Sequence, residues 1–157
     1  MLSALLTKKT SPLFLLLLAY PAGATITLIE PLSFGTIAVL DNSVTSDITI
    51  SQTSQTTIVN HIRVIEPGNA AEFVLTDLPG NVQVFTTVSV TQMTTTTVNP
   101  APTEQFTLVS VDTAPFVYTD GTGYASIKVG GTLRTSGNGG NYVDVQYQAS
   151  LQLTFNY

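Results

Sequence analysis

The chain of 157 residues contains no cysteine and a single histidine, and these two shortages exclude several kinds of protein. Without cysteine, disulfide bonds cannot stabilise the fold, as they do in many small secreted domains. A lipid anchor attached to a lipobox cysteine is excluded for the same reason. Zinc or iron sites built from cysteines or from a histidine cluster are excluded as well. Stability must therefore come from apolar burial and backbone hydrogen bonds.

Positive charge is also scarce in this chain. Five Lys and Arg stand against ten Asp and Glu. Lys8 and Lys9 belong to an N-terminal segment that we expect to be removed, which leaves three cations against ten acids and a formal charge of −7. Three scattered cations cannot neutralise a run of phosphates, so the sequence argues against nucleic acid as a partner. It argues equally against attraction to an anionic membrane surface.

The first two dozen residues have the composition of a secretory signal peptide. Lys8 and Lys9 precede the apolar run 13–19, which is about half as long as a bilayer-spanning helix. Ala22 and Ala24 fit the small-x-small pattern that a signal peptidase cuts. A retained membrane anchor is the competing interpretation, and the shortness of the run argues against it. We therefore expect a secreted protein without a stable membrane anchor, in the periplasm, at the cell surface or outside the cell.

Cleavage after Ala24 would divide the chain into a signal peptide, residues 1–24, and a mature region, residues 25–157. The mature region has the size of one domain with a core of its own. Thr and Val dominate it, and runs of period two are separated by Gly, Pro, Asn and Asp. We predict a single all-β domain, an antiparallel immunoglobulin-like or pilin-like β-sandwich of about seven or eight strands. A closed barrel is the alternative.

Seven runs ahead of the C-terminal segment are expected to form strands, each with its apolar residues on one face. These residues are Ile26 and Leu28; Ile48 and Ile50; Ile58, Ile62 and Val64 in a strand over 56–65; Phe73 and Leu75; Val82, Val84, Val88 and Val90; Phe106 and Leu108; and Ala125, Ile127, Val129 and Leu133. Turns are predicted at 78–81 and at Asp120-Gly121. Loops are predicted at 94–103 and 136–140.

The segment Val143–Tyr157 alternates apolar and polar residues without an error. Its apolar positions are Val143, Val145, Tyr147, Ala149, Leu151, Leu153, Phe155 and Tyr157. As one strand it would span roughly 50 Å, against roughly 17–20 Å for a common globular strand. Either this strand bends from one sheet to another, or part of it reaches a partner outside its own domain.

Candidate catalytic and metal-binding residues are few. His61 shares a strand phase with Arg63 and is expected on the solvent face, where a lone histidine makes a poor general base. Lys128 is likewise expected on an outer face, which disfavours an isopeptide cross-link. The acids are spread singly, without the spacing of a calcium loop, and no serine lies in a Gly-x-Ser-x-Gly elbow. We therefore predict a protein that is not an enzyme and that has no cofactor and no metal.

Four segments, taken in order, carry a family resemblance: residues 32–35 (LSFG), 73–80 (FVLTDLPG), 129–133 (VGGTL) and 140–144 (GNYVD) ahead of the alternating strand. Together they resemble a family of secreted bacterial domains of unknown function, similar to pilus subunits and to spore-coat-protein-U-like domains. The resemblance implies a pilin-like sandwich whose relatives donate a strand to the open groove of a neighbour. This chain departs from such subunits because it has no disulfide and no long donor segment before its first strand.

Two functions follow as hypotheses. The first is a cell-surface structural protein, a pilin-like or fimbrial subunit that self-associates or joins a pilus-type assembly by strand or edge pairing. The candidate assembly residues lie at the two ends of the mature chain: Ile26, Leu28, Leu151, Leu153, Phe155 and Tyr157. The alternative is an extracellular binding module, for example for glycans, that acts as a soluble monomer. Tyr118, Tyr124, Tyr142 and Tyr147 would form a sugar-binding platform if they clustered, although packing across strands is favoured.

Overall fold

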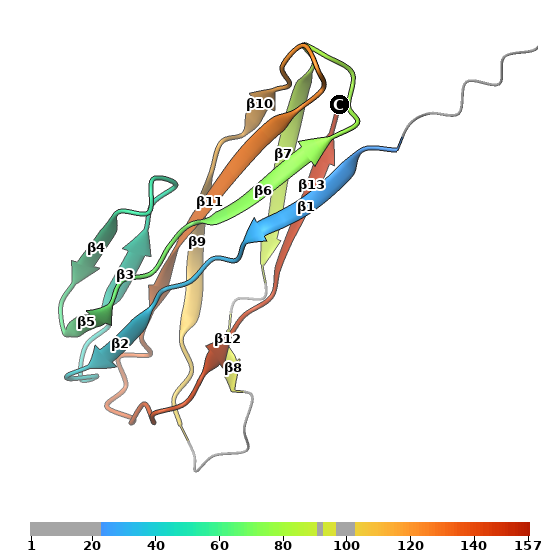
Figure 1. Ribbon diagram of the computed structural model, residues 1–157. Helices are drawn as coiled ribbons and strands as arrows, with labels where there is room; N and C mark the ends of the chain where they lie inside the picture. The colour runs from blue at the N-terminus through green and yellow to red at the C-terminus, as the bar shows by residue number, and fades with distance from the viewer. Residues whose placement is uncertain (1–22, 91–92, 97–102) are drawn as a thin grey trace, which may run out of the picture.

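The computed structural model describes residues 23–90, 93–96 and 103–157, and all of its regular elements are β-strands (Figure 1). The predicted signal peptide and most of the predicted loop at 94–103 lie outside these residues. Over the described ranges, no helix is long and apolar enough to cross a membrane. The prediction of an all-β fold with antiparallel pairing is confirmed.

The larger sheet is organised around its longest strand, β11. Its strands are β1 (Thr25–Glu30), β3 (Asp47–Ile50), β4 (Thr56–Val59), β6 (Ala71–Thr76), β9 (Thr107–Thr113) and β11 (Ala125–Arg134). Along one edge β11 pairs first with β6 and then with β3, while β9 occupies its opposite edge. β1 extends the sheet beyond β6, and β4 extends it beyond β3. All of these pairs are antiparallel.

A second sheet of three strands lies against the first, in the order β10 (Phe116–Tyr118), β7 (Gln83–Val90) and β13 (Leu151–Asn156). In Figure 1 this sheet lies behind β6 and β11. Two short pairs complete the fold: β2 (Thr36–Val39) with β5 (Ile62–Glu66), and β8 (Thr95–Thr96) with β12 (Tyr147–Gln148). The two layers form the predicted sandwich.

The core lies between the layers and consists of two apolar clusters. The first joins buried residues of the larger sheet to Val84 on β7, with β13 packed against it. The second lies nearer to β2 and β12, around Ile48, Phe106 and Leu133. The predicted inner face of β11 is confirmed, because Ala125, Ile127, Val129 and Leu133 are all buried. On the opposite face of this strand, Ser126, Lys128 and Arg134 are exposed, and Lys128 faces solvent as expected.

Two predicted strands are each broken in two. The strand expected over 56–65 is interrupted between β4 and β5, because Asn60 adopts a left-handed φ of 64°. Its side-chain amide donates to the Thr45 carbonyl at 2.7 Å, which fixes this turn. The strand expected over 143–157 is also interrupted: regular pairing begins only at β12, stops, and resumes at β13. β12 pairs with β8, whereas β13 pairs with β7. The C-terminal segment therefore bends from one sheet to another.

Candidate assembly groove

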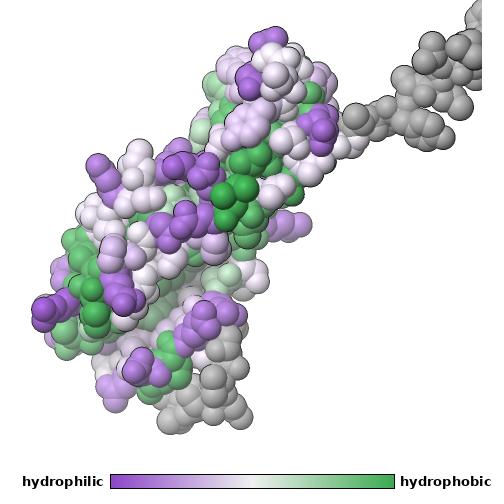
Figure 2. All heavy atoms as spheres, in the orientation of Figure 1, coloured by the Kyte–Doolittle hydropathy of each residue, from purple (hydrophilic) through white to green (hydrophobic). Residues whose placement is uncertain are grey.

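A long groove separates two segments that come from opposite ends of the described chain. One wall is the segment 31–39, which leads from β1 into β2, and the other is the segment 142–151, which contains β12 and the start of β13. The groove between them has a volume of about 1360 Å³. Figure 1 shows the paths of the two segments, and Figure 2 shows that the surface between β2 and β12 is hollowed. We call this hollow the assembly groove.

The floor of the assembly groove is part of the hydrophobic core. Ala71 of β6, Leu108 of β9 and Leu133 of β11 line it, and each belongs to one of the two buried clusters. Phe73 and Phe106 line it as well. Single apolar residues scattered over a protein surface are common, whereas a groove that opens onto core side chains is unusual. The sandwich is therefore incompletely covered along this line.

The two walls carry strand edges that have a partner on one side. In the described pairing, β1 bonds to β6, β2 to β5, β12 to β8 and β13 to β7, and no ladder joins the two walls. In an antiparallel ladder, alternate residues direct their N–H and C=O groups toward the opposite edge. An edge of this kind is a template for an additional strand.

The N-terminal wall is held firmly against β5 and the segment that follows it. Ser33 and Asn69 exchange two backbone hydrogen bonds of 2.9 and 3.0 Å. The Asn69 side chain also donates to the Pro31 carbonyl at 2.9 Å. Thr36 donates its hydroxyl to Glu66 at 2.7 Å. The wall is therefore positioned before any partner arrives.

An aromatic cluster forms the C-terminal wall. The rings of Tyr142 and Tyr147 lie 4.3 and 5.0 Å from that of Phe106, measured between centroids. The hydroxyl of Tyr147 is 2.7 Å from Thr103 Oγ1 and donates to the Val143 carbonyl at 3.0 Å. The hydroxyl of Tyr142 donates to the Gln105 carbonyl at 3.1 Å. Burial raises the pKa of Tyr142 above its ordinary value, so this ring stays neutral at physiological pH.

The predicted assembly residues lie in two different environments. Leu151, Leu153 and Phe155 are half-buried and pack against the first core cluster, with β13 paired to β7 over its whole length. Ile26 and Leu28 are each about half exposed on β1, and Leu28 lines the assembly groove. The remaining residue, the C-terminal Tyr157, is exposed. A role of these six residues in assembly stays a prediction.

Other residues singled out in the sequence are dispersed. His61 is exposed, as expected. Within the described ranges, no three His, Asp or Glu side chains are close enough to hold a metal ion. The four tyrosines do not form one platform, because Tyr142 and Tyr147 pack on Phe106 while Tyr118 packs on Phe116. Sequence reasoning missed the groove, since its walls come from segments without any shared motif.

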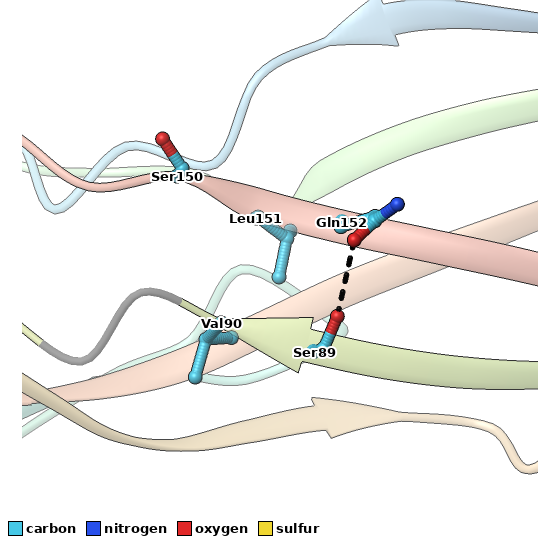
Figure 3. A pocket seen from close by; sticks show the side chains of 5 residues that line it. All are labelled: Ser89, Val90, Ser150, Leu151 and Gln152. Atoms are coloured by element: carbon cyan, nitrogen blue, oxygen red, sulfur yellow. Dashed lines mark hydrogen bonds between the residues drawn. The ribbon is translucent and has the colours of Figure 1, made fainter.

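A smaller hollow of about 220 Å³ lies where β7 ends and β13 begins (Figure 3). It is lined by Ser89, Val90, Ser150, Leu151 and Gln152. Ser89 donates its hydroxyl to Gln152 Oε1 at 3.4 Å, across the two strands. All five side chains are uncharged at neutral pH, so this hollow offers no acid–base chemistry. Leu151 lines both this hollow and the assembly groove.

The comparisons with known proteins identify a family. The family described as Domain of unknown function (DUF4402) matches residues 24–157, which is nearly all of the described chain. The protein therefore belongs to this family. The comparison with curated proteins gives no match, and neither does the comparison with solved structures.

Proposed function

We propose that the protein is a secreted, non-enzymatic structural subunit of the cell surface, pilin-like in architecture, that assembles by strand pairing. In this proposal the assembly groove of one copy accepts an extended segment of a second copy. The observation that carries the proposal is a groove whose floor is core and whose walls are strand edges. A strand inserted there would cover apolar side chains and form ladders on both sides, which is β-augmentation.

The first strand is the segment that we propose as the donor. All six residues of Thr25–Glu30 are exposed, and this strand is held by β6 along one edge. In the groove of a neighbour it would be flanked by two edges instead of one. Ile26 and Leu28 point to the same side of the strand, so both would face the floor. By contrast, Leu151, Leu153 and Phe155 already pack into their own core.

A proline in the C-terminal wall tests whether the groove accepts a strand. Ala149 is exposed, lies between β12 and β13, and lines the groove. Ala149→Pro removes a backbone N–H and places a ring on the edge, which blocks strand addition. Ala149→Ser is the matched control. We expect the mature wild-type protein and Ala149→Ser to form ordered polymers in sizing chromatography and negative-stain microscopy, and Ala149→Pro to remain a folded monomer.

Cysteine cross-linking tests the donor, and the absence of native cysteine makes the experiment clean. A Thr27→Cys protein mixed with an Ala149→Cys protein should form a mixed disulfide, because β1 of one copy would lie in the groove of the other. Thr53→Cys, in an exposed turn away from the groove, replaces Ala149→Cys in the control mixture. Equal yields in both mixtures would contradict β1 as the donor. A wild-type protein that stays monomeric at high concentration would contradict assembly and favour a soluble binding module.

A further inference from the structure

An exposed strip of three aromatic rings lies on the outer face of the second sheet, on the side of that sheet away from the core. Phe85 of β7 and Phe116 and Tyr118 of β10 form this aromatic strip, with 51%, 41% and 64% of their surface exposed. Their strand neighbours Val84 and Val117 point the other way, into the first core cluster. Figure 1 shows β10 and β7 side by side at one end of the molecule.

The strip is held in place by strand register. Phe116 stands directly opposite Phe85, and their ring centroids are 6.2 Å apart. Tyr118 follows two residues later on the same face, with its ring 5.8 Å from that of Phe116. Both pairs meet edge to face, at 62° and 80°. The rings are therefore positioned by backbone ladders before any ligand binds, and they do not form one flat surface.

The other side chains on this outer face are all amides or hydroxyls. They occupy the alternate positions of β7 and β13: Gln83, Thr87, Ser89, Gln152, Thr154 and Asn156. Each can donate and accept hydrogen bonds, and none is charged. The apolar members of the face are all aromatic. A face that combines rings with neutral hydrogen-bonding groups differs from an aliphatic protein interface and from a site for a charged ligand.

We propose that this face binds a neutral glycan chain. The C–H faces of pyranose rings stack on aromatic rings, whose π faces carry negative potential, and sugar hydroxyls exchange hydrogen bonds with amides and hydroxyls. Phe85 and Phe116 would take one sugar unit, and the row that includes Thr87, Thr154 and Gln152 would take the following units along β7. Because the rings are inclined to one another, a single soluble chain fits the strip, whereas a flat crystalline glycan surface does not.

Two substitutions at Phe85 separate ring stacking from simple apolar adhesion. Phe85→Tyr keeps the ring, and Phe85→Leu keeps an apolar side chain without one. Binding would be measured by calorimetry and affinity electrophoresis against soluble β-glucan, mannan, xylan and dextran. We expect Phe85→Tyr to bind like wild type and Phe85→Leu to bind about three- to tenfold more weakly, which matches the usual worth of an aromatic contact. Val59→Ala, an exposed apolar truncation on β4, should leave binding unchanged.

Three outcomes would overturn the proposal. The first is that none of the four polysaccharides retards the wild-type protein relative to its own mobility in a gel without polysaccharide. The second is equal binding by Phe85→Leu and Phe85→Tyr when both have wild-type melting temperatures. The third is a wild-type dimer that Phe85→Leu converts to a monomer, which would assign the strip to contacts between copies. The Ala149→Pro variant should bind the glycan like wild type, so this test is independent of assembly in the groove.

Discussion

Leu28 of the first strand and Leu151 of the last long strand line the same groove, although they lie near opposite ends of the described chain. No ladder joins their strands, since β1 pairs with β6 and β13 pairs with β7. Leu28 is about half exposed, whereas Leu151 packs against the first core cluster. The two strands therefore differ, because β1 is peripheral whereas β13 belongs to the core. This asymmetry leads to a prediction about the two ends of the chain.

Deleting either end should have opposite consequences. Removing residues 151–157 takes away three apolar side chains, each worth about 1.5–3 kcal/mol when fully buried, and the whole ladder between β13 and β7. Even for half-buried side chains this loss is comparable with a domain stability of about 5–15 kcal/mol, so we expect an unfolded protein. Removing residues 25–30, all exposed, should leave a folded protein that no longer assembles.

Circular dichroism and thermal unfolding of both deletions, beside the mature protein, measure the outcome. If the truncated protein, residues 25–150, is folded, then β13 is dispensable for the core and becomes a donor candidate again. A protein without residues 25–30 that still forms polymers would exclude β1 from the assembly mechanism.

Adding a peptide with the sequence of residues 25–32 in trans should inhibit polymer growth by the mature protein, and a scrambled peptide should not.

Alanine at Gly35 should destabilise the N-terminal wall of the groove. Gly35 has a left-handed φ of 75°, and a Cβ atom there would lie 2.1 Å from the Glu66 carbonyl oxygen. Gly139 is the matched control, because its φ is 83° and a Cβ atom there would meet nothing within 4 Å. We expect Gly139→Ala to cost about 1–2 kcal/mol of unfolding free energy, the penalty of the left-handed backbone alone. Gly35→Ala should cost clearly more in denaturant unfolding, and equal costs would contradict the close backbone packing at this wall.

Period-two patterning predicted the fold class and the inner faces of most strands, for a physical reason. A strand that is buried on one face must keep its apolar residues in phase, so Ile48 and Ile50, or Ile127 and Val129, reveal their orientation without any knowledge of the partner strand. These residues are indeed buried. The same logic places the apolar residues of β13 on the core side, where the structure has them.

Period-two patterning could not predict the breaks in strand pairing or the groove. The alternation over 143–157 continues through residues that do not pair regularly. An alternating pattern indicates which face of the segment is apolar, but it does not indicate whether a neighbouring strand pairs with it. Asn60 did carry a signal, since asparagine tolerates the left-handed region, but the apolar phase on either side masked it. The groove depends on how the segments 31–39 and 142–151 lie relative to each other in space, and this is set by the topology of the whole fold.

Replacing Thr86 by valine should stabilise the protein. Thr86 points toward the core from β7, and its hydroxyl is buried without a hydrogen-bond partner among the described residues. An unsatisfied buried hydroxyl costs about 1–3 kcal/mol, and valine has nearly the same shape without the polar atom. We expect Thr86→Val to raise the unfolding free energy by about 1 kcal/mol in denaturant titrations. Thr87→Val, one residue along on the exposed face, is the control and should have little effect. A destabilised Thr86→Val protein would indicate that the hydroxyl is satisfied after all.

The ion pair between Asp47 and Arg134 should make stability depend on acid pH. These residues stand opposite each other on β3 and β11, and Arg134 donates to both carboxylate oxygens at 2.7 and 2.8 Å. This hydrogen bonding lowers the pKa of Asp47 below its ordinary value of 3.8, against a smaller opposing effect of burial. Because the folded-state pKa lies below the unfolded-state pKa, the carboxylate stabilises the fold above about pH 3.8, and this stabilisation disappears as the pH falls through the lower folded-state pKa.

Thermal unfolding of the wild type and of Arg134→Gln across acid and neutral pH tests this dependence. At neutral pH we expect the wild type to melt a few degrees higher, since a partly exposed pair contributes little even with two good hydrogen bonds. The difference should shrink as the pH falls below about 3.8 and Asp47 is protonated. Arg134→Lys keeps the charge but loses the two-pronged geometry, so it should lie between the other two. A difference that persists unchanged at the acid end would show that Arg134 stabilises β11 through the packing of its stem, and not through Asp47.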